Sequence, residues 1–521
     1  MAQNPIINGW CSDPSILRVD KDYYLASSTF EWMPGVNLYH SRDLVHWEQL
    51  PSALMDDTLV PMEGLEPSCC IWAPNLTWHD GLFYIAYTIV QTARYRFKDT
   101  HNFLITAKDI CGPWSKPVYV GSTGFDPSVF HDDAGGKKYL VTQTMEHRTN
   151  RNRFAGVSVQ ELDSELHPIG LPRVVFPGTS RGTTEGPNII RRGDWYYITV
   201  AEGGTEFGHC VTIARSRNLF GPYEADPQSP MMSSAGTDCE LQRAGHGQLI
   251  DDPDGRWYMA HLCARPLEGK YSILGRECAI QNIEWSEDGW PRIAGTIGRA
   301  TPSLTFQGPD VEPVIYPEEP ETICFGDGLT RLWMTLRSMW PHCGISFDAR
   351  KGWMRITGGN SLCSHYRQHL TARRITSLHC SGTVHMSFKP QTHNHMAGLV
   401  CMYNCDNWHY LAMSCDDNGH PVLTVTTCAH GDLEDRTELL LPDSTEDVQL
   451  RAEVCGGDLR FLWALPGGRM QPVGPTLDMR ILSDEYVIGN GFTSAMIGVC
   501  CQDLQGNGCY ADFEWFTYRN E

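Results

Sequence analysis

A unit that occurs five times in the first three hundred residues constrains the fold more than any other feature of this sequence. Each unit begins with a small or polar residue before a short apolar run. The aligned positions are Pro14, Pro74, Pro127, Pro187 and Gly247, at intervals of 60, 53, 60 and 60 residues. A fixed period of roughly this length is typical of architectures in which each repeat is one supersecondary unit packed on its neighbours.

Each unit continues with a tight turn and a run that favours β-strand. Asp and Gly residues in the turn, as at 79–81, tolerate the positive φ of hairpins. Aromatic and β-branched residues follow, as in the run Trp-Tyr-Tyr-Ile-Thr at 195–199. Three or four short antiparallel strands per unit predict an all-β chain, in which residues 1–305 form a five-bladed β-propeller.

In a propeller the first strand of each blade lies nearest the axis, so the residue that opens it faces the central channel. The openers here are Asp13, the Trp72-Ala73 pair, Asp126, Glu185 and His246. Asp-Pro alone is common turn punctuation, because Pro pushes its predecessor into the β region and Asp caps turns. A role in turn formation does not account for three carboxylates at equivalent positions on one axis, where like charges repel. We therefore interpret them as a functional site.

Converging carboxylates suit the hydrolysis of a sugar acetal. That reaction needs one carboxylic acid to protonate the leaving oxygen, and one carboxylate to activate water or to attack. Glu185 lies among small neighbours at 182–187, which leave room for a ligand. A negative charge such as Asp126 would raise the proton affinity of Glu185 and make it a general acid. Asp13, in a more solvated setting, would stay ionised and act as general base.

Four short motifs resemble the markers of glycoside hydrolase family 43, in particular its β-xylosidases. They are Ser12-Asp13-Pro14-Ser15, Gly124-Phe125-Asp126-Pro127-Ser128, Thr184-Glu185-Gly186-Pro187 and Leu274-Gly275-Arg276-Glu277. The resemblance covers nearly the whole chain. It implies a five-bladed propeller, an inverting mechanism, and release of single sugars from the non-reducing ends of short chains. By position it implies that Asp13 is the general base, Glu185 the general acid, and Asp126 the residue that orients the acid and tunes its pKa.

The same resemblance implies a set of sugar-binding residues. Arg276 matches an arginine that contacts substrate hydroxyls, a task suited to its planar fork of donors. Phe30, Trp72 and His246 match residues that line the pocket. The aromatic residues have an alternative role in blade packing. His246 has two alternatives, a structural histidine or a holder of the water shell of a calcium ion, although the chemistry requires no cofactor.

One residue departs from the family pattern. Cys278 stands where a threonine is expected, and it lies two positions after Arg276.

The second half of the chain has a different pattern. Residues 306–321 are Pro-rich and acidic, which is typical of a linker. Residues 322–521 show alternating apolar runs separated by Gly, Asn and Asp, and predict a β-sandwich. The resemblance implies that this sandwich packs on the propeller and that Phe492 reaches the active-site mouth, although a strand-end packing role is the alternative. The pair His393 and His395 has metal-ligand spacing but no third ligand nearby, which indicates a solvated loop.

The amino-acid composition limits the classes of ligand that the protein is expected to bind. A net charge of −21 disfavours nucleic acid and anionic membranes and fits a small neutral oligosaccharide. The first residues lack the features of a signal peptide, and the 20 cysteines are scattered, so we expect reduced thiols and a cytoplasmic location. The leading hypothesis is an exo-acting β-xylosidase. An α-L-arabinofuranosidase, a bifunctional enzyme and a non-catalytic sugar-binding propeller are the alternatives, and a homo-oligomer stays open.

Overall fold

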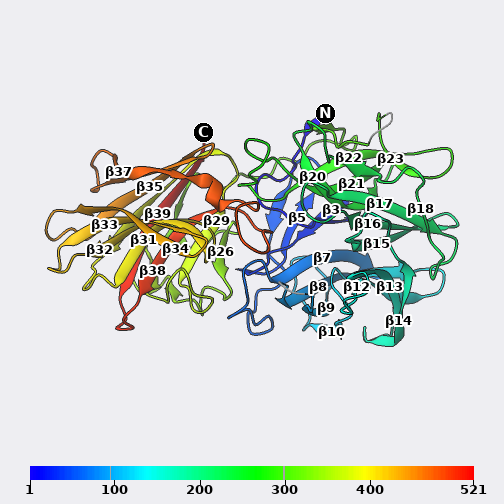
Figure 1. Ribbon diagram of the computed structural model, residues 1–521, viewed down its shortest axis with the longest axis horizontal. Coiled ribbons are helices and arrows are strands. Elements are labelled where there is room, and N and C mark those ends of the chain that lie inside the picture. Colours follow the sequence, from blue (N-terminus) through cyan, green and yellow to red (C-terminus); the bar gives the residue numbers. More distant parts are fainter. Residues whose placement is uncertain (94–95, 297–299) are drawn as a thin grey trace.

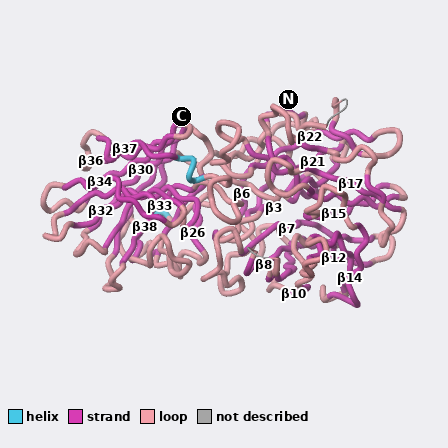
Figure 2. The backbone as a smooth tube through the Cα atoms, in the orientation of Figure 1, coloured by secondary structure: helices cyan, strands magenta, loops and turns pink. Residues whose placement is uncertain are grey.

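The protein consists of two β-rich lobes side by side, the first blue to green and the second yellow to red in Figure 1. The computed structural model describes residues 1–93, 96–296 and 300–521. Within these residues, helix is limited to two short 3-10 turns, η1 (Phe325–Asp327) and η2 (Met479–Leu482), and strands dominate both lobes (Figure 2). No helix in this part of the chain is long and apolar enough to cross a membrane. The prediction of an all-β chain is confirmed.

The first lobe is a ring of five antiparallel sheets, so the predicted five-bladed propeller is confirmed. Blade 1 contains β2 (Ser15–Val19), β3 (Asp22–Ser27), β5 (Asn37–Ser41) and β6 (Glu48–Leu50). Blade 2 contains β7 (Cys70–His79), β8 (Leu82–Thr92), β9 (Asp99–Ala107) and β10 (Val118–Gly121). Blade 3 contains β11 (Ser128–Asp132), β12 (Lys137–Met145), β13 (Phe154–Leu162) and β14 (Pro168–Phe176).

Blades 4 and 5 complete the ring. Blade 4 contains β15 (Glu185–Arg192), β16 (Trp195–Glu202), β17 (Cys210–Ser216), β18 (Glu224–Ala225) and β19 (Met232–Ser233). Blade 5 contains β20 (Gln242–Asp251), β21 (Trp257–Ala264), β22 (Glu277–Trp285) and β23 (Pro291–Ile293). The N-terminal segment runs along blade 5, where the amide of Ile6 donates to the carbonyl of Cys278 at 2.8 Å. A small sheet of β1 (Ala2–Gln3) and β24 (Thr305–Phe306) joins the two ends of the ring.

The second lobe is a sandwich of two antiparallel sheets, as predicted. One sheet contains β25 (Thr322–Cys324), β27 (Ile345–Ser346), β28 (Met354–Thr357), β30 (His379–Phe388), β35 (Asp447–Cys455), β36 (Asp458–Ala464), β37 (Gln471–Asp478) and β39 (Tyr510–Asn520). The other contains β26 (Trp333–Leu336), β29 (Leu370–Arg374), β31 (His395–Asn404), β32 (Asn407–Cys415), β33 (Pro421–Ala429), β34 (Asp432–Leu440) and β38 (Met496–Asp503).

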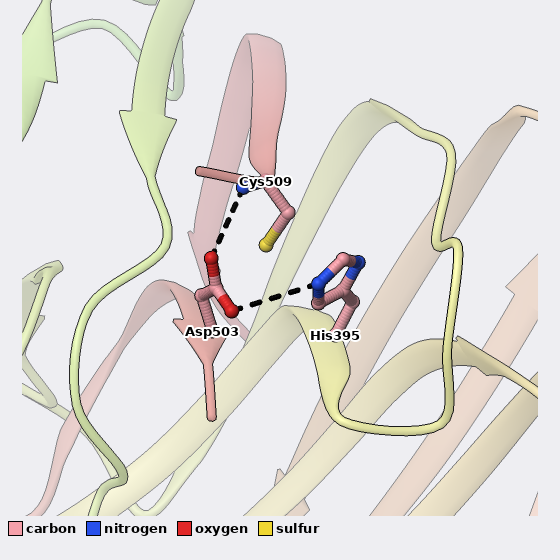
Figure 3. A group of neighbouring side chains, drawn as sticks. All are labelled: His395, Asp503 and Cys509. Carbon is pink, nitrogen blue, oxygen red and sulfur yellow. Dashed lines mark hydrogen bonds and ion pairs between the residues drawn. The ribbon is translucent and has the colours of Figure 1, made fainter. Parts of the chain in front are cut away.

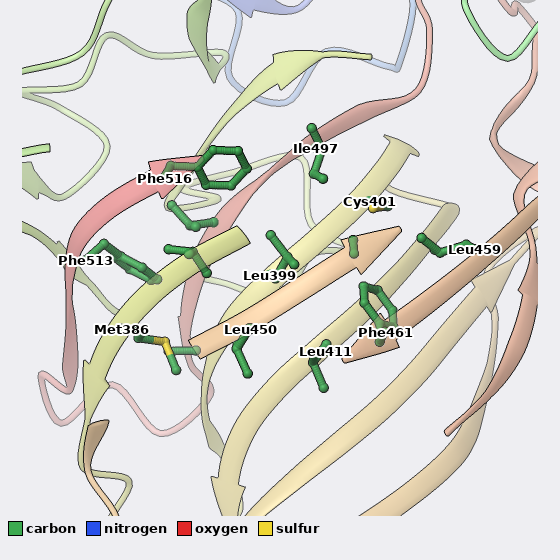
Figure 4. Close-up of a cluster of buried hydrophobic side chains, with 14 of the residues drawn as sticks. Met386, Leu399, Cys401, Leu411, Leu450, Leu459, Phe461, Ile497, Phe513 and Phe516 are labelled. Carbon is green, nitrogen blue, oxygen red and sulfur yellow. The ribbon is translucent and has the colours of Figure 1, made fainter. Parts of the chain in front are cut away.

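The core of the sandwich lies between these sheets, as Figure 4 shows. Alternate residues of β35 are buried because successive strand residues point to opposite faces. Buried side chains from both sheets meet there, among them Met386, Leu450 and Phe461 from one sheet and Leu399, Leu411 and Ile497 from the other.

The two lobes share a sheet. Strand β4 (Trp32–Met33) belongs to the propeller sequence, yet it pairs with β26 as the edge strand of the sandwich. Phe30, two residues earlier, pairs with Ile71 at the start of blade 2. The segment of blade 1 that contains Phe30 is therefore held by both lobes.

Candidate active site

Five positions with the same backbone conformation surround the propeller axis. Their φ angles are 53° at Asp13, 37° at Ala73, 54° at Asp126, 58° at Gly186 and 51° at His246. Left-handed φ is unfavourable for residues with a Cβ, by roughly 1–2 kcal/mol each, and it persists only where the surrounding structure imposes it. The blade repeat thus places strained backbone at the centre of the ring.

Glu185 is offset from this set. The residue equivalent to Asp13 and Asp126 is Gly186, whereas Glu185 occupies the position held by Trp72 in blade 2. The prediction of three carboxylates at equivalent positions is wrong in this respect. Consecutive residues direct their side chains differently, so a shift of one residue changes where the acid points. Gly186 is also needed for space, since a Cβ there would lie 2.8 Å from Nε2 of His246.

Asp13 is held as a carboxylate. Ser28 Oγ donates to its Oδ2 at 2.6 Å, and Arg276 Nη1 donates to its Oδ1 at 3.2 Å. Nδ1 of His246 lies 3.4 Å from the same Oδ1. Burial opposes ionisation, but these partners together outweigh it, so the pKa of Asp13 lies well below that of an ordinary aspartate. A low pKa keeps Asp13 ionised at neutral pH, and a general base must be ionised before it can accept a proton.

Glu185 has the opposite character. It is buried, and burial together with the charge of Asp126 raises the pKa of Glu185 to about 8. Nearby cations, His246 and Lys98, moderate that rise. A carboxyl group with this pKa keeps its proton near neutral pH and can donate it. The cavity therefore contains one acid that is ionised and one that is protonated.

Asp126 connects these groups. Its Oδ2 accepts a hydrogen bond from the backbone amide of Gly186 at 2.9 Å. Burial, reinforced by the charge of Asp13, raises the pKa of Asp126 to about 6. The pKa of His246 is raised as well, because its pairing with Asp13 and the nearby acids outweigh burial. At neutral pH the ionised Asp126 keeps Glu185 protonated, and His246 offsets part of the negative charge.

Aromatic side chains form one wall of the cavity. The ring of Phe492, from the sandwich, lies 5.4 Å from Trp72 and 5.8 Å from Phe30, centroid to centroid. Phe125 packs edge-on against Trp72 at 5.4 Å. Sugar rings present C–H faces that pack on such surfaces, so the wall suits a pyranose or furanose. Phe492 therefore belongs to the pocket.

Side chains of the propeller form hydrogen bonds with the backbone of Phe492. Its carbonyl accepts hydrogen bonds from Arg276 Nη2 at 3.1 Å and from Ser12 Oγ at 3.2 Å. Its amide donates to Ser68 Oγ at 3.3 Å. Arg276 thus joins the carboxylate of Asp13 to the sandwich through one guanidinium group.

A buried network of hydrogen bonds and an ion pair also holds the loop that carries Phe492. Arg243 Nη1, in blade 5, lies 2.9 Å from Asp484 Oδ2, in the sandwich. Tyr403 donates to Asp484 Oδ1 at 2.7 Å and accepts from the amide of Thr493 at 3.1 Å. This chain of contacts ties the loop that carries Phe492 to the fifth blade.

All eight residues singled out in the sequence line one cavity of about 340 Å³: Asp13, Phe30, Trp72, Asp126, Glu185, His246, Arg276 and Phe492. Sequence reasoning missed several other lining residues: Lys98, Phe125, Arg153, Phe154, Thr205, Glu206 and His209. The aligned repeats carried a signal for Phe125, which occupies the position of Trp72 in the next blade. Lys98 lies in a connection between strands and follows no repeat position.

Cys278, the departure from the family pattern, is buried behind the site. Its thiol contacts that of Cys11, which lies two residues before Asp13. All 20 cysteines of the chain are unpaired, and none falls at positions 94–95 or 297–299.

A small cavity on the propeller axis borders His246 and has a volume of about 20 Å³. The two ring nitrogens of His246 face Asp13 and Gly186.

A second group with metal-ligand chemistry lies in the sandwich (Figure 3). Ligand atoms of His395, Asp503 and Cys509 lie within 4.8 Å of one another, and His395 is buried, so the solvated loop predicted for it is wrong. The carboxylate oxygens of Asp503 accept hydrogen bonds from four backbone amides of the 505–509 turn. Nδ1 of His395 accepts a hydrogen bond from the backbone amide of Gln391. The ring proton of a neutral His395 is therefore on Nε2, which faces Oδ1 of Asn507. The group closes a turn and offers no free ligand set.

Comparisons with known proteins identify both lobes. Residues 2–291 match the model of glycosyl hydrolases family 43. The chain belongs to this family. Residues 325–519 match the β-xylosidase C-terminal concanavalin A-like domain. The family 43 chain is thus a glycoside hydrolase of the β-xylosidase type, with a propeller and a sandwich of known kinds.

Relatives resemble the family 43 chain over its full length. It is 39% identical to the xylosidase/arabinosidase 43B of Humicola insolens, over 99% of this chain and 97% of that protein. It is 38% identical to a xylan 1,3-β-xylosidase of a Vibrio species, over 99% and 98%. A solved structure of xylan β-1,4-xylosidase from Bacillus halodurans C-125 superposes with a TM-score of 0.97 at 41% identity, with complete coverage of both chains.

Proposed function

We propose that this exo-glycosidase hydrolyses β-xylosidic bonds at the non-reducing ends of short xylo-oligosaccharides, with inversion at the anomeric carbon. The observation that carries the proposal is the pair of carboxyl groups with opposite proton affinity in one cavity. Asp13 has a lowered pKa and Glu185 a raised one. Inverting hydrolysis needs this division between a base for water and an acid for the leaving oxygen.

In this mechanism Asp13 removes a proton from the attacking water. Ser28 and Arg276 hold its carboxylate in place and keep it ionised. Glu185 gives its proton to the glycosidic oxygen as that bond breaks. Asp126 keeps Glu185 protonated by charge and fixes the adjacent peptide through the amide of Gly186.

The shape of the cavity supports removal of one terminal sugar at a time. Its volume of about 340 Å³ is near the low end of ordinary ligand pockets. Phe492 from the sandwich and Phe30 and Trp72 from the propeller close one side. A long chain would have to pass through this wall, whereas a chain end fits.

Arabinofuranosidase activity is the second candidate. The Humicola insolens relative is named for both xylosidase and arabinosidase activity, and it matches nearly the whole chain. The two pentoses can present similarly placed hydroxyl groups to one pocket. A chain that cleaves both sugars is therefore the natural extension of the leading proposal.

Hydrolysis of nitrophenyl β-xyloside, nitrophenyl α-L-arabinofuranoside and xylobiose tests the proposal. We expect xyloside cleavage by the wild type and a loss of several orders of magnitude in Asp13→Ala and in Glu185→Ala. Proton NMR of the first product should show α-xylose from a β-xyloside. Retention of the β-configuration would contradict the role of Asp13, and inactivity on all three substrates would favour the non-catalytic binding propeller.

We also propose that the reaction needs no cofactor and takes place in the cytoplasm. The unpaired thiols support a reducing compartment. Activity that survives dialysis against a chelator would agree with the first statement. Cell fractionation tests the second.

A further inference from the structure

Lys98 lies in the active-site cavity, and no group of opposite charge in the described part of the chain is in direct contact with it. It precedes β9 in blade 2 and lines the cavity that contains Glu185 and Asp126. Within the residues that the structure describes, its Nζ makes no hydrogen bond and no ion pair. It lies 4.9 Å from the ring centroid of Trp72 and 5.3 Å from that of Phe125. Two aromatic faces thus hold the ammonium group, and its N–H donors stay available to the cavity.

The surrounding charges place Lys98 on one side of the reaction. Burial and the charge of Arg153 lower the pKa of Lys98 to about 8, whereas Glu185 and Asp126 oppose that change. Cys69 is a further titratable neighbour that raises it. The cations that act on Asp13 are Arg276 and His246, and His246 acts on Glu185 as well. Lys98 acts on Glu185 and Asp126 and is not among the groups that act on Asp13, so it lies on the acid side of the cavity.

In an inverting hydrolase the acid marks the side on which the leaving group departs, and water enters from the opposite side. A cation beside the acid can have two effects on the leaving side of the reaction. It donates to a hydroxyl of the departing sugar, and it limits the proton affinity of Glu185, so that the proton can still be released.

We propose that Lys98 is a specificity-determining residue for the leaving sugar, which it binds through its ammonium group beside Glu185. This inference rests on the proposed function, because it takes Glu185 as the acid. It explains why a lysine occupies an aromatic pocket that otherwise suits neutral sugar faces. Packing alone would not require the charge.

The test compares Lys98→Met with the wild type on two substrates. Xylobiose has a leaving sugar with hydroxyl groups, whereas nitrophenyl β-xyloside has a leaving group without them. Loss of a charged hydrogen bond should lower kcat/KM for xylobiose about 10- to 100-fold, and that for the nitrophenyl substrate by less than about threefold. Lys116→Met is the matched control, since Lys116 is an exposed lysine of the same blade.

A pH profile separates this role from simple packing. Lys98 lowers the pKa of Glu185, so Lys98→Met should move the alkaline limb of kcat/KM for xylobiose to higher pH, and Lys98→Arg should return it toward the wild type. Melting curves of each variant check that the fold is kept. Equal losses on both substrates, or no loss on either with an active wild type, would overturn the inference. A wild type inactive on every sugar would instead refute the proposed function.

Discussion

The carboxylate of Asp126 accepts the backbone amide of Gly186 at 2.9 Å, one residue after the proposed acid Glu185. A single group thereby acts on Glu185 in two ways. Its charge raises the pKa of Glu185, and its hydrogen bond fixes the peptide from which the Glu185 side chain projects. The two effects can be separated experimentally, because an amide side chain keeps an acceptor oxygen and loses the charge.

Asp126→Asn should move the alkaline limb of the pH profile downward. Removal of the negative charge lowers the pKa of Glu185, so the acid loses its proton at lower pH, by roughly one unit. The measurement is kcat/KM for xylobiose between pH 5 and about 9.5. Asp133→Asn, at an exposed position in the same blade, is the control. An unmoved limb with full activity would remove Asp126 from the mechanism.

Glu185→Gln should stabilise the protein, and more so at alkaline pH. The folded pKa of Glu185 is about 8 against an ordinary value of 4.5, so the wild type loses stability as pH rises from about 4.5 to 8. The glutamine variant lacks that loss, which is of the order of 5 kcal/mol. Melting temperatures at pH 5 and pH 9 test this. A difference between the two proteins that does not grow with pH would show that Glu185 titrates normally.

Arg276→Met should move the acidic limb of the profile upward. The guanidinium group is the strongest partner that favours the ionised form of Asp13, so its removal raises the pKa of Asp13. We expect kcat/KM to fall by about 10²- to 10³-fold as well, because the substrate contact proposed for Arg276 and its hydrogen bond to the Phe492 carbonyl are lost. Arg276→Lys keeps the charge and should leave the limb nearer its original place. A limb that stays fixed in Arg276→Met would exclude this coupling.

Tyr403→Phe should loosen the sandwich loop at the cavity mouth. The hydroxyl links Asp484 to the amide of Thr493, and its loss costs about 1–3 kcal/mol of stability and raises KM more than it lowers kcat. Tyr410→Phe is a matched control, because its hydroxyl bonds the carbonyl of Cys500 inside the same sheet. Equal kinetic effects in the two variants would show that Tyr403 has only a structural role.

Much of the fold could be read from the sequence. The repeated openers and turns predicted five blades, and the alternating runs after residue 321 predicted the sandwich. Both signals are local, since a strand shows its period over a few residues and a repeat needs only comparison with itself. The motifs around Asp13, Asp126, Glu185 and Arg276 likewise marked residues that share one cavity.

The sequence by itself determined the architecture and the chemical type of the site, because strand period, turn residues and carboxylates in repeat positions are properties of short segments. The tertiary structure alone decided the placement of Lys98 between two aromatic rings and the hydrogen bonds that Ser12 and Arg276 donate to the carbonyl of Phe492. Ser12 and Phe492 are 480 residues apart. Contacts over such separations leave no local pattern, and the pKa values depend on burial and on charges that only the packed lobes bring together.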